Sequence, residues 1–162
     1  MQIEIVEAYE NLKNLSALFQ EYASSLGVDL NYQNFSAELS GLPGKYAKPD
    51  GRLYLVFVDG VPAGCVAMRR LDGSRAEMKR LFIRPEYRGL HLGRLLVKQI
   101  IADATAIGYH SLVLDTLSTM EHAKSLYRSL DFVEIEPYYN SPIPNTTFLS
   151  LLLETDSEQP SI

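Results

Sequence analysis

The segment RPEYRGLHLGRLL at residues 84–96 combines residue types and spacing that suit the binding of an anion. It lies between a predicted strand and a predicted long helix, whose first amides have no intrahelical acceptor and carry positive potential. Gly89 and Gly93 allow the backbone to approach a phosphate, and Arg88 and Arg94 add positive charge. The segment therefore predicts a phosphate site. The turn by itself is equally compatible with an ordinary strand-to-helix connection that carries solvated arginines.

The sequence RGLHLG at residues 88–93 resembles the pyrophosphate-binding motif of the GNAT acyltransferase superfamily, which is Arg or Gln, two residues, Gly, one residue, then Gly or Ala. The fourth place departs from the motif, because His91 replaces a glycine and a positive φ would strain a histidine there. The resemblance continues in MKRLFIRPEYRG, in LDT of the following strand and in AKSLYRSLDF of the next helix. It covers about residues 52–153 and implies a GNAT-like fold and acetyl-CoA as acyl donor.

This resemblance implies roles for three groups of residues. The pyrophosphate would be bound by Arg88, Gly89, Leu90, His91, Leu92, Gly93 and Arg94. The pantetheine arm would pair with backbone groups of Leu81, Phe82 and Ile83. The thioester would then lie between two splayed parallel strands, where a backbone N–H at Phe82 or nearby would donate to the oxyanion.

Tyr127 occupies the position of the tyrosine that lies beside the thioester sulfur in many members of the superfamily. A tyrosine hydroxyl has an unperturbed pKa of about 10, so it could protonate a departing thiolate. Periodicity also offers a packing role, because Tyr127 shares an apolar helix face with Ala123, Leu126 and Leu130. The resemblance favours the catalytic role.

Glu77 matches the position of the glutamate that some members use as a general base. A partly buried carboxylate can deprotonate an ammonium directly or through a water molecule. The alternative is an exposed strand residue that pairs with Lys79 or Arg75.

The acceptor site is predicted from aromatic residues. Tyr138 and Tyr139 lie in the loop PYYNSPIPN, whose prolines and asparagines indicate a semi-rigid surface segment. Tyr32 and Phe35 are further candidates in a weaker helix. All four could instead simply cover the sheet edge.

Composition restricts the classes of protein that fit. The chain has 162 residues, 46% of them hydrophobic, and a net charge of -5, which suits one domain over residues 1–154 followed by a polar tail at 155–162. The overall excess of acidic residues argues against a nucleic-acid partner. Residues 65–98, however, contain nine Lys and Arg residues and only three acidic residues, and this local positive charge favours an anionic ligand. One cysteine and three histidines show no metal-ligand spacing, so no metal is expected, and Cys65 is expected to be a small buried residue. No leader or membrane-spanning segment is recognised, which predicts a cytoplasmic protein.

Hydrophobic periodicity and turn residues predict the elements that position these residues. The predicted strands cover residues 3–8, 53–58, 61–71, 76–83, 110–116, 132–136 and 147–153, and the predicted helices cover 11–26, 32–39, 90–107 and 120–130. Strand 76–83, helix 90–107 and strand 110–116 form a β-α-β unit, so these two strands should be parallel neighbours. The expected class is α+β, with a mixed, mostly antiparallel sheet and flanking helices.

The function predicted from these residues is transfer of an acetyl group from acetyl-CoA to the amine of a small-molecule or amino-acid-like acceptor. The acidic remainder of the chain mildly favours a cationic acceptor. The alternative is a non-catalytic module that binds acyl-CoA. A nucleotide-binding P-loop is disfavoured, because no Lys and Ser or Thr follow the last glycine. Pairing of edge strands would allow a homodimer.

Overall fold

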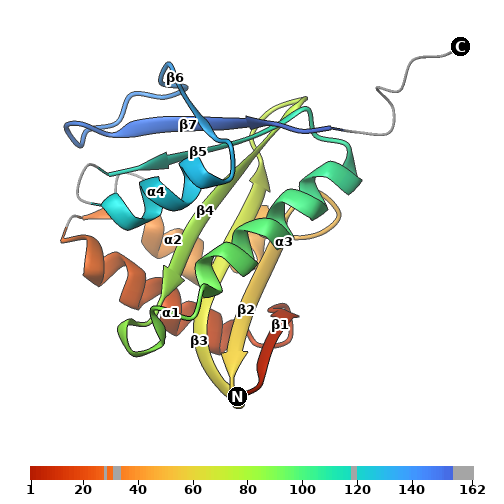
Figure 1. The fold of residues 1–162 in the computed structure, drawn as a ribbon, viewed down its shortest axis with the longest axis vertical. Coiled ribbons are helices and arrows are strands. Elements are labelled where there is room, and N and C mark those ends of the chain that lie inside the picture. The colour runs from red at the N-terminus through yellow and green to blue at the C-terminus, as the bar shows by residue number, and fades with distance from the viewer. Residues whose placement is uncertain (28, 31–33, 118–119, 155–162) are drawn as a thin grey trace, which may run out of the picture.

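The computed structural model describes residues 1–27, 29–30, 34–117 and 120–154. Within these residues seven strands form one sheet in the order β1-β2-β3-β4-β5-β7-β6 (Figure 1). The strands are β1 (Ile3–Glu7), β2 (Arg52–Val58), β3 (Val61–Arg70), β4 (Arg75–Ile83), β5 (Ser111–Thr116), β6 (Val133–Ile135) and β7 (Thr147–Leu152). The helices are α1 (Leu12–Leu26), α2 (Phe35–Ser40), α3 (Leu92–Ile107) and α4 (Glu121–Ser129), with single 3-10 turns η2 (Gly44–Tyr46) and η3 (Pro85–Tyr87).

The helices cover both faces of the sheet and divide the core in two (Figure 1). On one face, α3 and α4 pack against side chains such as Met78 of β4 and Leu112 of β5. On the other face, α1 packs against a second cluster that includes Leu55, Cys65 and Phe82. Cys65 is fully buried, as predicted, and burial raises the pKa of its thiol. The sheet therefore lies between two layers of helices.

One turn of the sheet and the directions of its strands follow from the local sequence. Asp59 and Gly60 both adopt positive φ values, of 50° and 82°, and join β2 to β3 as the predicted hairpin turn. The first four strands are antiparallel neighbours, and β4 and β5 are parallel, as the β-α-β pattern predicts. The predicted α+β class is confirmed.

Strands β4 and β5 separate soon after they begin. Their pairing runs only from Arg75 opposite Ser111 to Glu77 opposite Val113, and Figure 1 shows them diverging toward their C-terminal ends. A β-bulge in β4 accompanies the separation, because Arg80 and the residue after it lie opposite one residue of β3, and Arg80 has a φ of 64°. The divergence leaves space between two strands of one sheet.

No helix in the described part of the chain is both long enough and apolar enough to cross a membrane.

Candidate active site

A groove of about 1080 Å³ runs between the end of β4, the N-terminus of α3 and α4. All of the residues predicted to bind the acyl donor line it except Leu90, which packs against the core beneath α3. The groove-lining residues from these predictions are Leu81, Phe82, Ile83, Arg88, Gly89, His91, Leu92, Gly93 and Arg94. Its volume is slightly above the range usual for ligand pockets, which suits an extended donor such as acetyl-CoA.

The N-terminus of α3 forms the anion-binding end of this groove. The first intrahelical bond runs from the Leu95 N–H to the His91 carbonyl at 3.2 Å, so the amides of residues 92–94 have no intrahelical acceptor. No side chain caps the helix. Gly89 has a φ of 92°, and the space that a Cβ would take there is open. These features fit a pyrophosphate, whose oxygens would accept from the amides.

His91 stands where the motif has a glycine, and it adopts a backbone conformation that favours glycine. Its φ is 61° and its ψ is 26°, which is the left-handed region. The strain expected from a histidine at this position is therefore present, while its exposed side chain lies at the groove wall. The departure from the motif adds a side chain and strain and leaves the turn intact.

Arg88 of the motif and Arg94, which follows it, both bind the walls of the groove through their guanidinium groups. Arg88 Nε donates to the carbonyl of Ile83 at 3.2 Å, and Arg94 Nη2 donates to Ser129 Oγ at 2.8 Å. Both guanidinium groups therefore add positive charge close to the amides at the start of α3.

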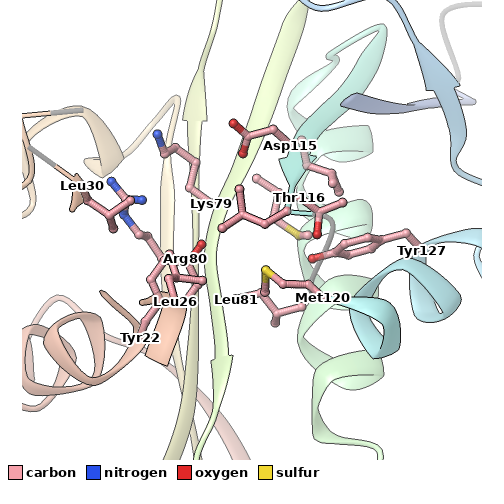
Figure 2. A pocket seen from close by; sticks show the side chains of 13 residues that line it. Tyr22, Leu26, Leu30, Lys79, Arg80, Leu81, Asp115, Thr116, Met120 and Tyr127 are labelled. Carbon is pink, nitrogen blue, oxygen red and sulfur yellow. The ribbon is translucent and has the colours of Figure 1, made fainter. Parts of the chain in front are cut away.

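A second hollow, of about 40 Å³, lies in the gap between β4 and β5 (Figure 2). This cavity meets the groove, because both are lined by Leu26, Leu81 and Met120. Its remaining wall consists of Tyr22, Leu30, Met78, Lys79, Arg80, Leu114, Asp115, Thr116, Leu117 and Tyr127. A donor that lies in the groove would present its reactive end to this cavity.

The position of Tyr127 is compatible with both of the roles considered from the sequence, and its catalytic role stays a prediction. Its ring is buried in the core beside Phe132, with 5.6 Å between the ring centroids. Figure 2 shows the side chain reaching from α4 into the cavity. Burial raises the pKa of the Tyr127 hydroxyl, so it remains protonated at neutral pH and can donate a hydrogen bond.

Thr116 was not recognised as a site residue from the sequence. It is the last residue of β5 and is 4% exposed, and its Oγ1 has no hydrogen-bond partner among the described residues. Figure 2 shows it at the cavity that Tyr127 enters. The signal was present in the motif LDT at residues 114–116, because the carboxyl end of a parallel strand is a common place for ligand contacts.

Glu77 is buried and belongs to a polar network beside the cavity. Its Oε1 accepts from Arg69 Nε at 2.9 Å, and its Oε2 accepts from the Tyr138 hydroxyl at 2.7 Å. The alternative of an exposed residue paired with Lys79 or Arg75 is wrong, because Glu77 is 2% exposed and its ion-pair partner is the residue opposite it on β3. Its role as a general base stays a prediction.

Tyr138 and Tyr139 lie against Phe148 of β7, with ring centroids 5.1 and 5.2 Å from it. Their hydroxyls donate to two carboxylates, Glu77 and Asp115 respectively. The loop therefore covers the sheet and also holds the acidic groups next to the cavity. Tyr32 lies outside the described residues, and its predicted contact with the acceptor stays a prediction.

Charged groups gather on the side of the cavity formed by β4. Arg80 is 3% exposed and makes two hydrogen bonds of 3.0 Å to Glu38 of α2. Burial, together with the positive charges of Arg80 and Lys45, lowers the pKa of the neighbouring Lys79 to about 8. Burial also raises the pKa of Asp115 on the opposite strand. The described residues contain no cluster of His, Cys, Asp and Glu that could hold a metal ion.

Comparison with known proteins agrees with this geometry. Residues 12–132 match the model of the acetyltransferase (GNAT) family. The chain belongs to this family. An uncharacterized N-acetyltransferase of Schizosaccharomyces pombe is 45% identical over 93% of the chain and 94% of its own length, and one of Dictyostelium discoideum is 35% identical over 95% and 100%.

Solved structures show the same fold. An acetyltransferase from Streptococcus agalactiae matches with a TM-score of 0.76 and 25% identity, over 93% of this GNAT chain and 98% of its own. A GNAT acetyltransferase from Staphylococcus aureus matches with a TM-score of 0.79 and 20% identity, over 94% and 100%. The resemblance inferred from the motif is therefore confirmed at the level of family and fold.

Proposed function

We propose that this GNAT protein is an N-acetyltransferase that takes the acetyl group from acetyl-CoA and transfers it directly to a small-molecule amine. The observation that supports this best is the meeting of the groove and the cavity at Leu26, Leu81 and Met120. The groove fits a long anionic donor, and the cavity adjoins it where the donor's reactive end would lie. A structure of the same fold from Salmonella typhimurium is described with acetyl-CoA as its cofactor.

Acetyl-CoA supplies an activated acyl carbonyl when it is bound. The amides of α3 and the guanidinium groups of Arg88 and Arg94 hold its pyrophosphate. The end of β4 aligns the pantetheine arm. Because the Arg84 N–H donates to the Ala63 carbonyl and directions alternate along an antiparallel ladder, the amides of Leu81 and Ile83 point away from β3.

The same alternation changes the expected oxyanion donor. The amide of Phe82 faces β3, where Phe82 pairs with Cys65, so it is poorly placed for the proposed role. The amide of Leu81 is better placed, because Leu81 lines both the groove and the cavity. This backbone donor would stabilise negative charge on the carbonyl oxygen as the amine attacks.

The Tyr127 hydroxyl points into the cavity and is available to the leaving thiolate. Its raised pKa makes it a weaker acid than an ordinary phenol, so hydrogen bonding to the sulfur is a larger part of its contribution than full proton transfer. Glu77 remains the proposed base, acting through its network beside the cavity.

Acceptor-dependent release of free thiol tests the proposed function. The protein is incubated with acetyl-CoA and a panel of amines, polyamines, amino acids and peptides, and the thiol is detected colorimetrically. At least one acceptor should give thiol well above the acceptor-free rate. If acetyl-CoA binds by calorimetry but no member of the panel releases thiol, the protein is instead a non-catalytic module that binds acyl-CoA.

A further inference from the structure

The gap between β4 and β5 has a closed end and an open end. The last backbone pair joins Glu77 of β4 to Val113 of β5, and the two strands diverge beyond it (Figure 1). The next residues along these strands are Met78 and Leu114, and both line the cavity. These two residues therefore form the closed end of the gap.

The closed end is apolar and buried. Met78 is 3% exposed and Leu114 is 1% exposed, and both belong to the core cluster beneath α3 and α4. Side chains alternate along a strand, so the charged residues that follow them, Lys79 and Asp115, point to the other face of the sheet. A group that reaches the closed end on the α3 side of the sheet therefore meets apolar side chains.

Other strands hold both sides of the closed end in place. Met78 lies opposite Met68 of β3, and Leu114 lies opposite Leu149 of β7, in antiparallel pairs. Side chains in a closely packed core cannot move aside without strain in their neighbours. The closed end therefore forms a fixed wall for whatever enters the gap.

The order of the donor contacts along the chain gives the direction in which the acyl group points. The proposed pyrophosphate site at residues 88–94 follows the C-terminal end of β4, and the proposed pantetheine contacts run back along β4 from Ile83 to Leu81. Leu81 lines both the groove and the cavity (Figure 2). A donor that follows this path points its acyl tail back along β4, toward Met78 and Leu114.

The volume of the cavity restricts the length of that tail. A volume of about 40 Å³ holds about three atoms of the size of a water molecule. The methyl group, the carbonyl carbon and the carbonyl oxygen of an acetyl group would fill this space. Each methylene added to the acyl chain would push the tail against Met78 and Leu114.

We infer that Met78 and Leu114 determine the acyl specificity of this protein, so that it transfers acetyl and discriminates against straight-chain acyl groups according to their length. The inference rests on the proposed acetyl transfer and specifies which acyl donors the same site accepts. The two side chains limit the length of the acyl group and take no part in the chemical step.

A series of donors with a single acceptor tests the limit on length. Acetyl-CoA, propionyl-CoA and butyryl-CoA are compared at a fixed concentration of an amine that supports thiol release. The carbonyl groups of these thioesters differ little in reactivity, so the comparison measures fit. We expect kcat/KM for the donor to fall by about 10-fold or more from acetyl to propionyl and by about 100-fold or more from acetyl to butyryl, as usual for added methylenes in an apolar pocket.

Substitutions at the closed end test which residues set the limit. Leu114→Ala should lower the acetyl-to-butyryl ratio of kcat/KM by about 10-fold or more, because the truncated side chain leaves space for the longer tail. Met78→Ala should change the ratio in the same direction. Leu112→Ala is the matched control and should leave the ratio unchanged, since Leu112 is a fully buried leucine of the same strand and core cluster that does not line the cavity.

Truncation of a buried side chain also destabilises the fold, so a milder substitution accompanies these variants. Leu114→Val removes a single methylene and should lower the ratio in the same direction by a smaller factor. Calorimetric binding of coenzyme A, which carries no acyl group, should be the same in the wild type and in every variant. Equal binding shows that each protein is folded and that its donor groove is intact.

The outcomes separate this inference from the proposed function. Equal or better use of butyryl-CoA by the wild type overturns the inference, as does a ratio that the substitutions of Met78 and Leu114 leave intact or that Leu112→Ala lowers equally. Thiol release from acetyl-CoA in any of these cases would still support acetyl transfer. Absence of thiol release with every donor and every amine would overturn the proposed function and the inference with it.

Discussion

At the scale of single residues, Tyr127 has to satisfy two requirements, because its ring belongs to the core and its hydroxyl to the cavity. Tyr127→Phe keeps the ring and removes only the hydroxyl. We expect kcat to fall by about 10- to 100-fold, at or below the low end for a positioned acid, because thiolate is a good leaving group and the raised pKa makes the phenol a weak acid. The free energy of unfolding should change by less than about 1 kcal/mol.

The measurement is steady-state turnover at saturating substrates, under conditions where the chemical step limits the rate. Unchanged kcat would make Tyr127 a packing residue. A large loss of stability or of acetyl-CoA affinity would give the hydroxyl a structural role instead.

We predict that a substitution at Thr116 has opposite effects on stability and on activity. Thr116→Val removes an orphaned buried hydroxyl, so the free energy of unfolding should rise by about 1 kcal/mol. Activity should fall, because the ligand loses a hydrogen-bond partner. Urea denaturation and kcat/KM measure the two effects. Thr105→Val is a matched control, since Thr105 Oγ1 donates to the Ile101 carbonyl at 2.8 Å and its loss should not stabilise the protein.

At the scale of elements, the helices and strands could be predicted closely, because they carry strong periodic signals. The long helix near residues 90–107 and the run LYLVFV at residues 53–58 each have one dominant pattern of apolar residues. The bulge in β4 could not be predicted, since an arginine at positive φ has no sequence signal of its own. The bulge nevertheless sets which backbone amides face the groove.

The contacts of the site were less predictable than its elements. Glu77 was expected to be either a base or an exposed residue, but its partners are Arg69 across the hairpin and Tyr138 from a loop 61 residues away. Such partners depend on strand register and on the return of β7 to β5, which no local pattern contains. The residues predicted to bind the donor nearly all line one groove, because they come from one continuous segment, and their binding role stays a prediction.

The turn before α3 makes a prediction about His91. His91→Gly should raise the free energy of unfolding by about 1 kcal/mol, because glycine adopts the observed φ of 61° without a clash of its Cβ. Thermal or urea denaturation measures this. His91→Ala keeps the strain and removes the imidazole, so it should not stabilise the protein. If both substitutions stabilise the protein, the destabilisation by His91 comes from its imidazole and not from its backbone conformation.

At the scale of the whole molecule, the divergence of β4 and β5 allows one sheet to line both the groove and the cavity. The donor groove lies along the ends of β4 and α3, and the cavity lies within the gap. The sheet's two halves are joined there only by the pairs from Arg75 to Glu77. Binding of a donor across the end of β4 should therefore stabilise the folded protein as a whole.

This stabilisation can be predicted in magnitude. A ligand that binds only the folded state at 100 times its Kd contributes about 2.7 kcal/mol. For a chain of this length each kcal/mol corresponds to a Tm increase of about 2–4 °C, so acetyl-CoA should raise Tm by about 5–10 °C. Differential scanning fluorimetry at increasing acetyl-CoA measures it.

Substitutions of Gly93 test where acetyl-CoA binds. Gly93→Glu places a carboxylate at the start of α3, where it repels the pyrophosphate and competes for the helix amides, so the Tm increase should disappear. The variant should still fold, because an acidic residue in the first turn of a helix is favourable. Gly93→Ala should keep the increase, since its Cβ would meet Leu126 at an ordinary contact distance of 3.4 Å. A Gly93→Glu protein that acetyl-CoA still stabilises by several degrees would show that the pyrophosphate binds away from this helix.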